Sequence, residues 1–229
     1  MIKINSGGYS DVHITDESVI ISGTEKKQAN YFRKEQKVYK YAKEFFKENQ
    51  WYFDPWGYSI SDEILPLYCF NEMNEIVEAI KRGKDVYTSG GMVEFKKKQA
   101  MIRIAIDDRS DRLSAGIKRI IRHEIIHYCL WLLEKSWHDN DLLFWCYAYV
   151  FDGGAYESLD SENLKKYELF KTLYDKYIEN IPYKYKTYCL KSVLVYLDNE
   201  ELNAEKFENH VKKCVKEPYG MYCTSWLDK

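Results

Sequence analysis

Hydrophobic and polar positions follow two different periods along this chain, and each period predicts a kind of element. Segments in which apolar side chains recur every three or four residues predict helices. Four such segments are residues 26–49, 115–134, 140–150 and 162–180. Residues 92–98 and 100–107 instead alternate with a period of two, most clearly at Ile102, Ile104 and Ile106, and predict two strands. The pattern therefore predicts an α+β protein.

Weaker patterns lie outside these segments. Residues 1–25 alternate loosely between turn residues, which predicts a small N-terminal hairpin. Residues 71–82 predict a short helix that Gly83 ends. In the last third of the chain, 188–196 has the composition of a strand and 204–216 predicts a short helix.

The candidate chemistry is concentrated in His123-Glu124-Ile125-Ile126-His127, inside the helix predicted at 115–134. Residues four apart share a face of a helix, so the imidazoles of His123 and His127 can reach one ion. Glu124 lies at the rim of that face, where its carboxylate can hold a water without ligating the metal. Two nitrogen ligands, an open coordination position and a nearby carboxylate are what zinc-assisted peptide hydrolysis requires.

The same five residues could also be ordinary helix positions that bind no metal. The flanking residues argue against this, because they make the helix strongly apolar. They are Ile120, Ile121, Ile125, Ile126, Leu130 and Leu133. Burying two histidines and a glutamate in such a helix is costly unless these side chains have partners, so a metal site is the favoured interpretation.

A zinc site of this kind needs a third protein ligand, and the chain after His127 offers two candidates. Leucines at 130 and 133 stand where the metzincin pattern requires glycine and histidine, which excludes that class. Glu157 is the candidate for a thermolysin-like site, although it follows a Gly-Gly turn rather than lying inside a helix. His138 is the other candidate, in the turn that follows the helix.

Taken in order, these motifs resemble the SprT-like zinc metalloproteases, a family that includes Spartan, the protease that degrades proteins crosslinked to DNA. The resemblance covers about residues 30–160. Its matching pieces are Thr88-Ser89-Gly90-Gly91, Ile102-Arg103-Ile104, the stretch from Ile120 to Tyr128, His138-Asp139 with Phe144, and Gly153-Gly154. The resemblance implies that His123, His127 and His138 ligate one zinc ion and that Glu124 is the general base.

The resemblance also implies a fold. It is an α+β, zincin-like core in which the HExxH helix and a following helix accompany a small mixed sheet, with an edge strand beside the cleft. The expected parts are an N-terminal hairpin extension at 1–25, a SprT-like metalloprotease domain at 26–160 and a C-terminal helical and strand extension at 161–229. The last part departs from bacterial members that end in a cysteine-pair zinc ribbon, because its cysteines are the isolated Cys189, Cys214 and Cys223.

The composition of the chain bears on its size class, its possible partners and its expected cellular location. The 229 residues suffice for one large or two small domains, and 45% hydrophobic with 31% charged residues is typical of a globular protein. The net charge of -2 gives no global basic field, so DNA is a partner by family analogy only. The chain has no CxxC pair, no signal-peptide pattern and no apolar run long enough for a membrane span, which predicts a reducing, cytoplasmic location.

The sequence therefore predicts a zinc-dependent endopeptidase that acts on a protein or peptide substrate. An extended substrate would add to an edge strand at 102–106, which makes Arg103 and Ile104 the substrate-binding candidates. Tyr128 and Tyr156 are the candidates for assisting the oxyanion.

Two alternative functions stay open at this point. In the first, the zincin scaffold is a protein-binding module with little or no proteolysis, and the aromatic loop predicted at 51–58 and the tail 183–226 engage the partner. In the second, the chain is a DNA-associated protease, by family analogy alone. The sequence makes no prediction of the oligomeric state.

Overall fold

The computed structural model describes the stretches of the chain that hold its helices and strands. These are residues 2–3, 12–14, 19–21, 25–53, 65–71, 91–96, 99–107, 110–154, 159–199 and 203–216. Over these residues the protein is α+β, with six α-helices and a small three-stranded mixed sheet, as the hydrophobic pattern predicts. Two compact units divide the chain, one of residues 1–44 with 65–124 and one of residues 45–64 with 125–229.

The N-terminal part of the first unit forms a short antiparallel sheet of its own. Its strands are β1 (Ile2–Lys3), β2 (Val12–Ile14) and β3 (Val19–Ile21). β2 pairs antiparallel with β3, as the hairpin expected within 1–25 would, and β1 adds to the other side of β2.

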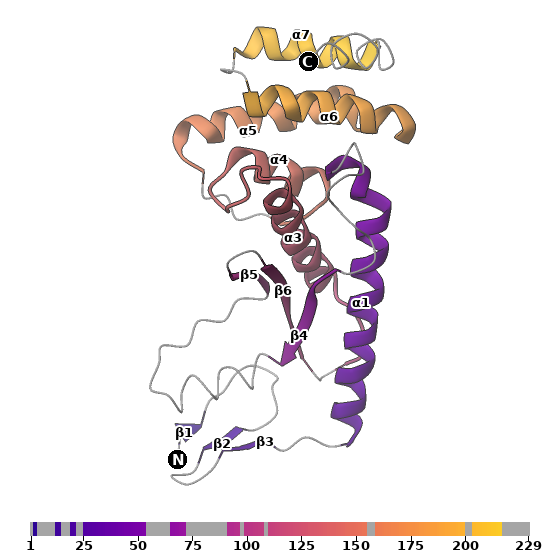
Figure 1. Cartoon of the computed structure of the whole chain (residues 1–229), viewed down its shortest axis with the longest axis vertical. Coiled ribbons are helices and arrows are strands. Elements are labelled where there is room, and N and C mark those ends of the chain that lie inside the picture. The colour runs from indigo at the N-terminus through magenta and orange to yellow at the C-terminus, as the bar shows by residue number, and fades with distance from the viewer. Residues whose placement is uncertain are drawn as a thin grey trace. The chain divides into compact units, whose positions relative to one another are not determined.

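The first unit also holds the mixed sheet, and its strand order decides where a further strand can add (Figure 1). Its strands are β4 (Leu67–Asn71), β5 (Gly91–Lys96) and β6 (Gln99–Ile106), in the order β4-β6-β5. β6 pairs parallel with β4 and antiparallel with β5. Both sides of β6 are therefore occupied, so the edge position expected for 102–106 was wrong. Among the described strands of this sheet, the two edges are β4 and β5.

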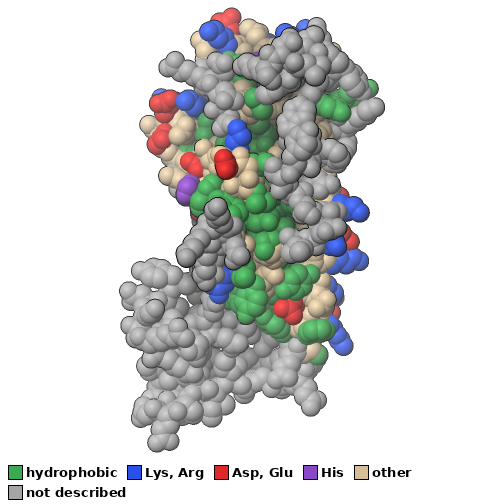
Figure 2. All heavy atoms as spheres, viewed as in Figure 1, with side chains coloured by type: hydrophobic (Ala, Val, Ile, Leu, Met, Phe, Trp, Pro, Cys, Tyr) green, Lys and Arg blue, Asp and Glu red, His purple; other side chains and the backbone are tan. Residues whose placement is uncertain are grey.

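Apolar side chains gather over one face of this sheet in the space-filling view (Figure 2). Tyr68 and Met92 both pair in register with Arg103, and Met101 lies two residues before Arg103 on the same face. Tyr68 is 50% exposed and Met101 is 46% exposed, whereas Ile102 and Ile104 on the opposite face are fully buried. The strict alternation of β6 therefore separates a core face from a face that carries exposed apolar side chains.

The helix α1 (Glu25–Phe53) confirms the prediction at 26–49 and continues beyond it. The segment from residue 51 to 53 was expected to begin an aromatic loop, but it is the last turn of this helix. The reason is burial in the second unit. The side chains of Tyr52 and Phe53 are almost fully buried, and the Phe53 ring stacks on that of Tyr147 with centroids 5.0 Å apart.

The second unit holds helices and turns but no strand among its described residues. Besides the end of α1, its elements include α4 (Leu142–Val150), α5 (Ser161–Leu173), the π turn η1 (Tyr174–Ile178), α6 (Tyr183–Asn199) and α7 (Ala204–Lys216). They confirm the helices predicted at 140–150, 162–180 and 204–216. Figure 1 shows α7 lying along α6 at the C-terminal end of the unit.

The strand expected at 188–196 is wrong, because this segment belongs to α6. The β-branched and aromatic composition suggested a strand, but the burial has a helical period. Cys189, Leu190, Val193 and Leu194 are buried, while Val195 is 39% exposed. One apolar stripe at spacings of three and four is what a helix buries against its neighbours, and here it overrides the local β-propensity.

The Gly153-Gly154 break that ends α4 is confirmed. Asp152 and Gly154 have φ angles of 50° and 136°, so the chain turns through conformations that favour small or glycine residues. A Cβ on Gly153 would lie 2.9 Å from Cδ1 of Ile126, a residue of the HExxH helix. Gly153 is therefore needed for close packing against that helix.

Several expectations lie outside the described residues. They are the helix predicted at 71–82 apart from Asn71, which ends β4, the turn predicted at 88–91 apart from Gly91, which begins β5, the aromatic residues 54–58, Tyr156, Glu157 and the tail beyond 216. Within the described residues, none of the helices combines the length and the apolar character that crossing a membrane requires.

Candidate metal centre

The helix α3 (Ala115–Leu132) carries the HExxH motif, as the sequence predicts. Ser114 precedes the helix, and its Oγ accepts the N–H of Ile117 at 3.1 Å and so caps the first turn. Ile121 and Ile125 are fully buried along one side of the helix. This anchored side fixes the rotation of α3 and therefore the direction of its two histidines.

His123 and His127 lie one turn apart on α3, and Asp139 lies in the turn that follows the helix. One ligand atom of each of these three side chains lies within 4.8 Å of the other two. Two imidazole nitrogens and one carboxylate oxygen are a donor set that fits a zinc-type ion and leaves a further coordination position open. The His123, His127 and Asp139 group can therefore hold a metal ion.

The surroundings of His127 fix which of its nitrogens is available. Its Nδ1 contacts the carbonyl oxygen of Trp137, which can only accept a hydrogen bond, so Nδ1 carries the proton. The unprotonated Nε2 then faces Asp139, whose Oδ1 is 3.3 Å away. The ring is also stacked on Phe144, with centroids 4.0 Å apart and planes 9° apart. His127 is thus held in the tautomer and orientation that a metal ligand needs.

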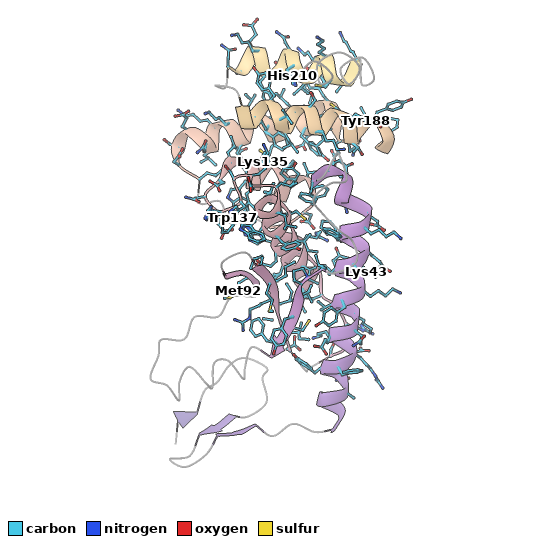
Figure 3. All side chains as sticks on the ribbon, viewed as in Figure 1. Lys43, Met92, Lys135, Trp137, Tyr188 and His210 are labelled. Carbon is cyan, nitrogen blue, oxygen red and sulfur yellow. The ribbon has the colours of Figure 1, made fainter. Side chains whose placement is uncertain are left out.

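Trp137 connects this arrangement to the turn after α3. Figure 3 shows Trp137 beside α3, and its ring packs edge-on to His127 at 6.3 Å between centroids. The turn carrying Asp139 therefore lies against the helix that carries the histidines.

Glu124 lies next to the edge strand β5 within the first unit. Its side chain is buried, with the whole residue only 5% exposed. A Cβ built on Gly91, the first residue of β5, would lie 2.8 Å from both Cγ and Oε1 of Glu124 and 2.6 Å from Ile120. Only glycine leaves room for this approach, so the absence of a side chain at 91 lets the carboxylate reach the strand.

His138, the third zinc ligand implied by the family resemblance, does not belong to this group as the structure places it. Its side chain is 60% exposed and its ring stacks on Trp137 at 3.8 Å between centroids. Its Nδ1 is 3.3 Å from Asp141 Oδ2, and its backbone N–H donates to the same oxygen at 2.7 Å. Its role as a ligand stays a prediction. Sequence reasoning missed Asp139, although the quoted His-Asp pair contains it.

The substrate-binding candidates have different surroundings. Ile104 is fully buried in the core face of β6. The guanidinium of Arg103 lies over the Phe70 ring at 4.8 Å, and its Nη1 is 3.8 Å from Met92 Sδ. Tyr128 follows His127 on α3, and burial raises the pKa of its hydroxyl, which keeps it a donor at neutral pH.

Comparisons of the chain with protein-family models, with curated proteins and with solved structures gave no match. The resemblance to SprT-like proteases thus depends on the ordered motifs of the sequence. What the structure adds is the ligand group on α3 and in the turn after it, with a buried glutamate beside an edge strand.

Proposed function

We propose that this protein is a metal-dependent endopeptidase, with zinc as its metal, of the SprT-like kind that its motifs resemble. The observation that carries the proposal is the grouping of His123, His127 and Asp139 within 4.8 Å, with Glu124 on the same helical turn. A zinc ion bound there would supply a Lewis acid that lowers the pKa of a bound water and polarises a carbonyl.

Each residue of the site has a defined part in this proposal. His123, His127 and Asp139 hold the metal. Glu124 accepts the proton of the attacking water on its carboxylate and later delivers it to the nitrogen of the leaving amine. Glu124 is not one of the ligand group, and its burial next to β5 keeps the carboxylate in place for both transfers.

The edge strand offers a way to present the scissile bond. β5 pairs with β6 on one side, and none of the described strands pairs with its other side, where an extended peptide can add through main-chain hydrogen bonds. Such a peptide would pass Gly91, where a Cβ would lie 2.8 Å from the Glu124 carboxylate. Strand addition therefore favours an unfolded or extended protein substrate over a folded one.

The test compares the full chain with its Glu124→Gln variant, both loaded with zinc. The variant should keep its metal and fold, because Glu124 is not a ligand, and should lose hydrolysis of a denatured protein by orders of magnitude. Equal cleavage by the variant would sink the proposal. If the zinc-loaded wild type binds unfolded protein without cleaving it, the function is instead that of a protein-binding module.

A further inference from the structure

A second cluster of reactive side chains lies where α7 packs on α6, and it shares no residue with the candidate metal centre. It consists of Cys189 and Ser192 on α6 with His210 and Cys214 on α7, and we call it the dithiol cluster. His210 Nε2 is 3.2 Å from Ser192 Oγ and 3.3 Å from the Ser192 carbonyl oxygen. Figure 3 shows His210 on α7 on the side that faces α6.

Helical spacing brings these four side chains together. His210 and Cys214 are four residues apart on α7, and Cys189 and Ser192 are three apart on α6, so each pair shares a helical face. Phe207 and Val211 bury the same face of α7 completely. The two helices are therefore anchored around the cluster by apolar packing, and the polar side chains are held in one register.

The two thiols are in contact with each other. Cys189 and Cys214 are each only 1% exposed, and they lie close enough together that each shifts the pKa of the other. They are separate thiols in this structure rather than a disulfide. Two neighbouring thiols on packed helices can form a disulfide if their sulfurs approach to about 2.05 Å.

The neighbours of Cys214 favour its thiolate. Hydrogen bonds from the Cys189 thiol, His210 and Ser192 hold the pKa of the Cys214 thiol well below its usual range. The interaction with Cys214 in turn raises the pKa of the His210 imidazole and the pKa of the Cys189 thiol. These directions favour Cys214 over Cys189 as the nucleophile, because the thiolate is the reactive form of cysteine.

We propose that Cys189 and Cys214 are an oxidisable pair that hydrogen peroxide converts into a disulfide joining α6 to α7. The Cys214 sulfur attacks one oxygen of the peroxide, the O–O bond breaks, and sulfenic acid and hydroxide form. The Cys189 sulfur then attacks the Cys214 sulfur and expels hydroxide, which leaves as water with the Cys189 proton. Two thiols lose two electrons in total, and one peroxide becomes two waters.

Other cysteines of the chain provide internal controls. Cys129 and Cys146 are fully buried in α3 and α4, and desolvation raises the pKa of both thiols well above the usual range. Their thiols should react slowly with peroxide, because the thiolate is the reactive form.

In the experiment, the reduced full chain is treated with increasing concentrations of hydrogen peroxide. It is then unfolded in a denaturant that contains iodoacetamide, which blocks the remaining free thiols, and is digested for peptide mapping without reduction. The expected result is a cross-linked peptide pair containing Cys189 and Cys214, with a mass loss of about 2 Da for two hydrogens, while Cys129 and Cys146 are alkylated. His210→Gln should slow cross-link formation about tenfold, because it removes the group beside the Cys214 sulfur. The matched control is Lys213→Gln, on the exposed face of the same helix.

Three outcomes overturn the proposal. One is oxidation of Cys129 or Cys146 at the same peroxide concentration as the pair. Another is a disulfide from either cysteine to Cys223 in place of the predicted one. The third is a bound metal in the purified chain that disappears in the Cys189→Ser, Cys214→Ser double variant, since the cluster would then be a metal site. The wild-type peptide map decides the first two even where a variant fails to fold.

Discussion

His138 and Asp139 are adjacent in the chain, yet the turn after α3 sends their side chains to different neighbours. Asp139 lies 3.3 Å from His127 Nε2, whereas His138 stacks on Trp137. We therefore predict that Asp139→Ala lowers zinc affinity by more than the ~10–100-fold typical of losing an outer-shell partner. His138→Ala should change it less. Zinc titration of the two variants measures the difference. The reverse order would return His138 to the ligand position that the family resemblance implies.

Gly91 is a second residue whose part in the site can be tested by adding one carbon atom. In Gly91→Ala the new Cβ would be 2.8 Å from Glu124 Oε1, so the carboxylate must move away from the strand. We predict a loss in kcat/KM of about 100-fold with zinc content unchanged, since a misplacement of ~1 Å has an effect of this size. Gly116→Ala is the matched control, because its nearest neighbour, Ser114 Oγ, is at 3.8 Å. Equal losses in both variants would remove Gly91 from the site.

At the scale of the element, the cap of α3 has an effect that can be measured separately from catalysis. Ser114→Ala leaves the Ile117 N–H without the side-chain acceptor that it has at 3.1 Å. This should lower the free energy of unfolding by about 1 kcal/mol. Urea unfolding checks it, with the exposed Ser161→Ala as control, a change expected to be close to neutral. If the Ser114 cap does not stabilise the protein, the two variants will have the same urea midpoint of unfolding.

Elements that are specified by a residue pattern within one segment could be predicted from the sequence. The period of α3 and the spacing of His123 and His127 both lie within one helix, so the candidate ligand pair follows from the sequence alone. The position of β6 does not, because its partners β4 and β5 come from separate segments, and only their pairing makes it the central strand. Asp139 was missed for a related reason. The Trp137 carbonyl contact and the turn geometry select one side chain of a dipeptide, and neither has a sequence pattern.

For the whole molecule, removing the metal should affect stability as well as activity. A metal that binds the folded chain and not the unfolded one adds to the free energy of unfolding by mass action. Dialysis against a chelator should therefore abolish hydrolysis and lower Tm, and zinc should restore both. Glu124→Gln is the informative control, since it should show the same shift in Tm without any hydrolysis. A Tm that is indifferent to the chelator would argue against a bound metal.

The division of the chain into two compact units has a consequence for how the protein is made. Each unit combines two separated stretches, and the second joins residues 45–64 to residues 125–229. On a ribosome, the end of α1 therefore emerges long before its partners. The Tyr147 hydroxyl, for example, donates to the Tyr52 carbonyl across 95 residues of sequence. Until α4 has been synthesised, the buried aromatic residues at the end of α1 have no native surface to cover them, and a nascent chain is a substrate for chaperones at that stage.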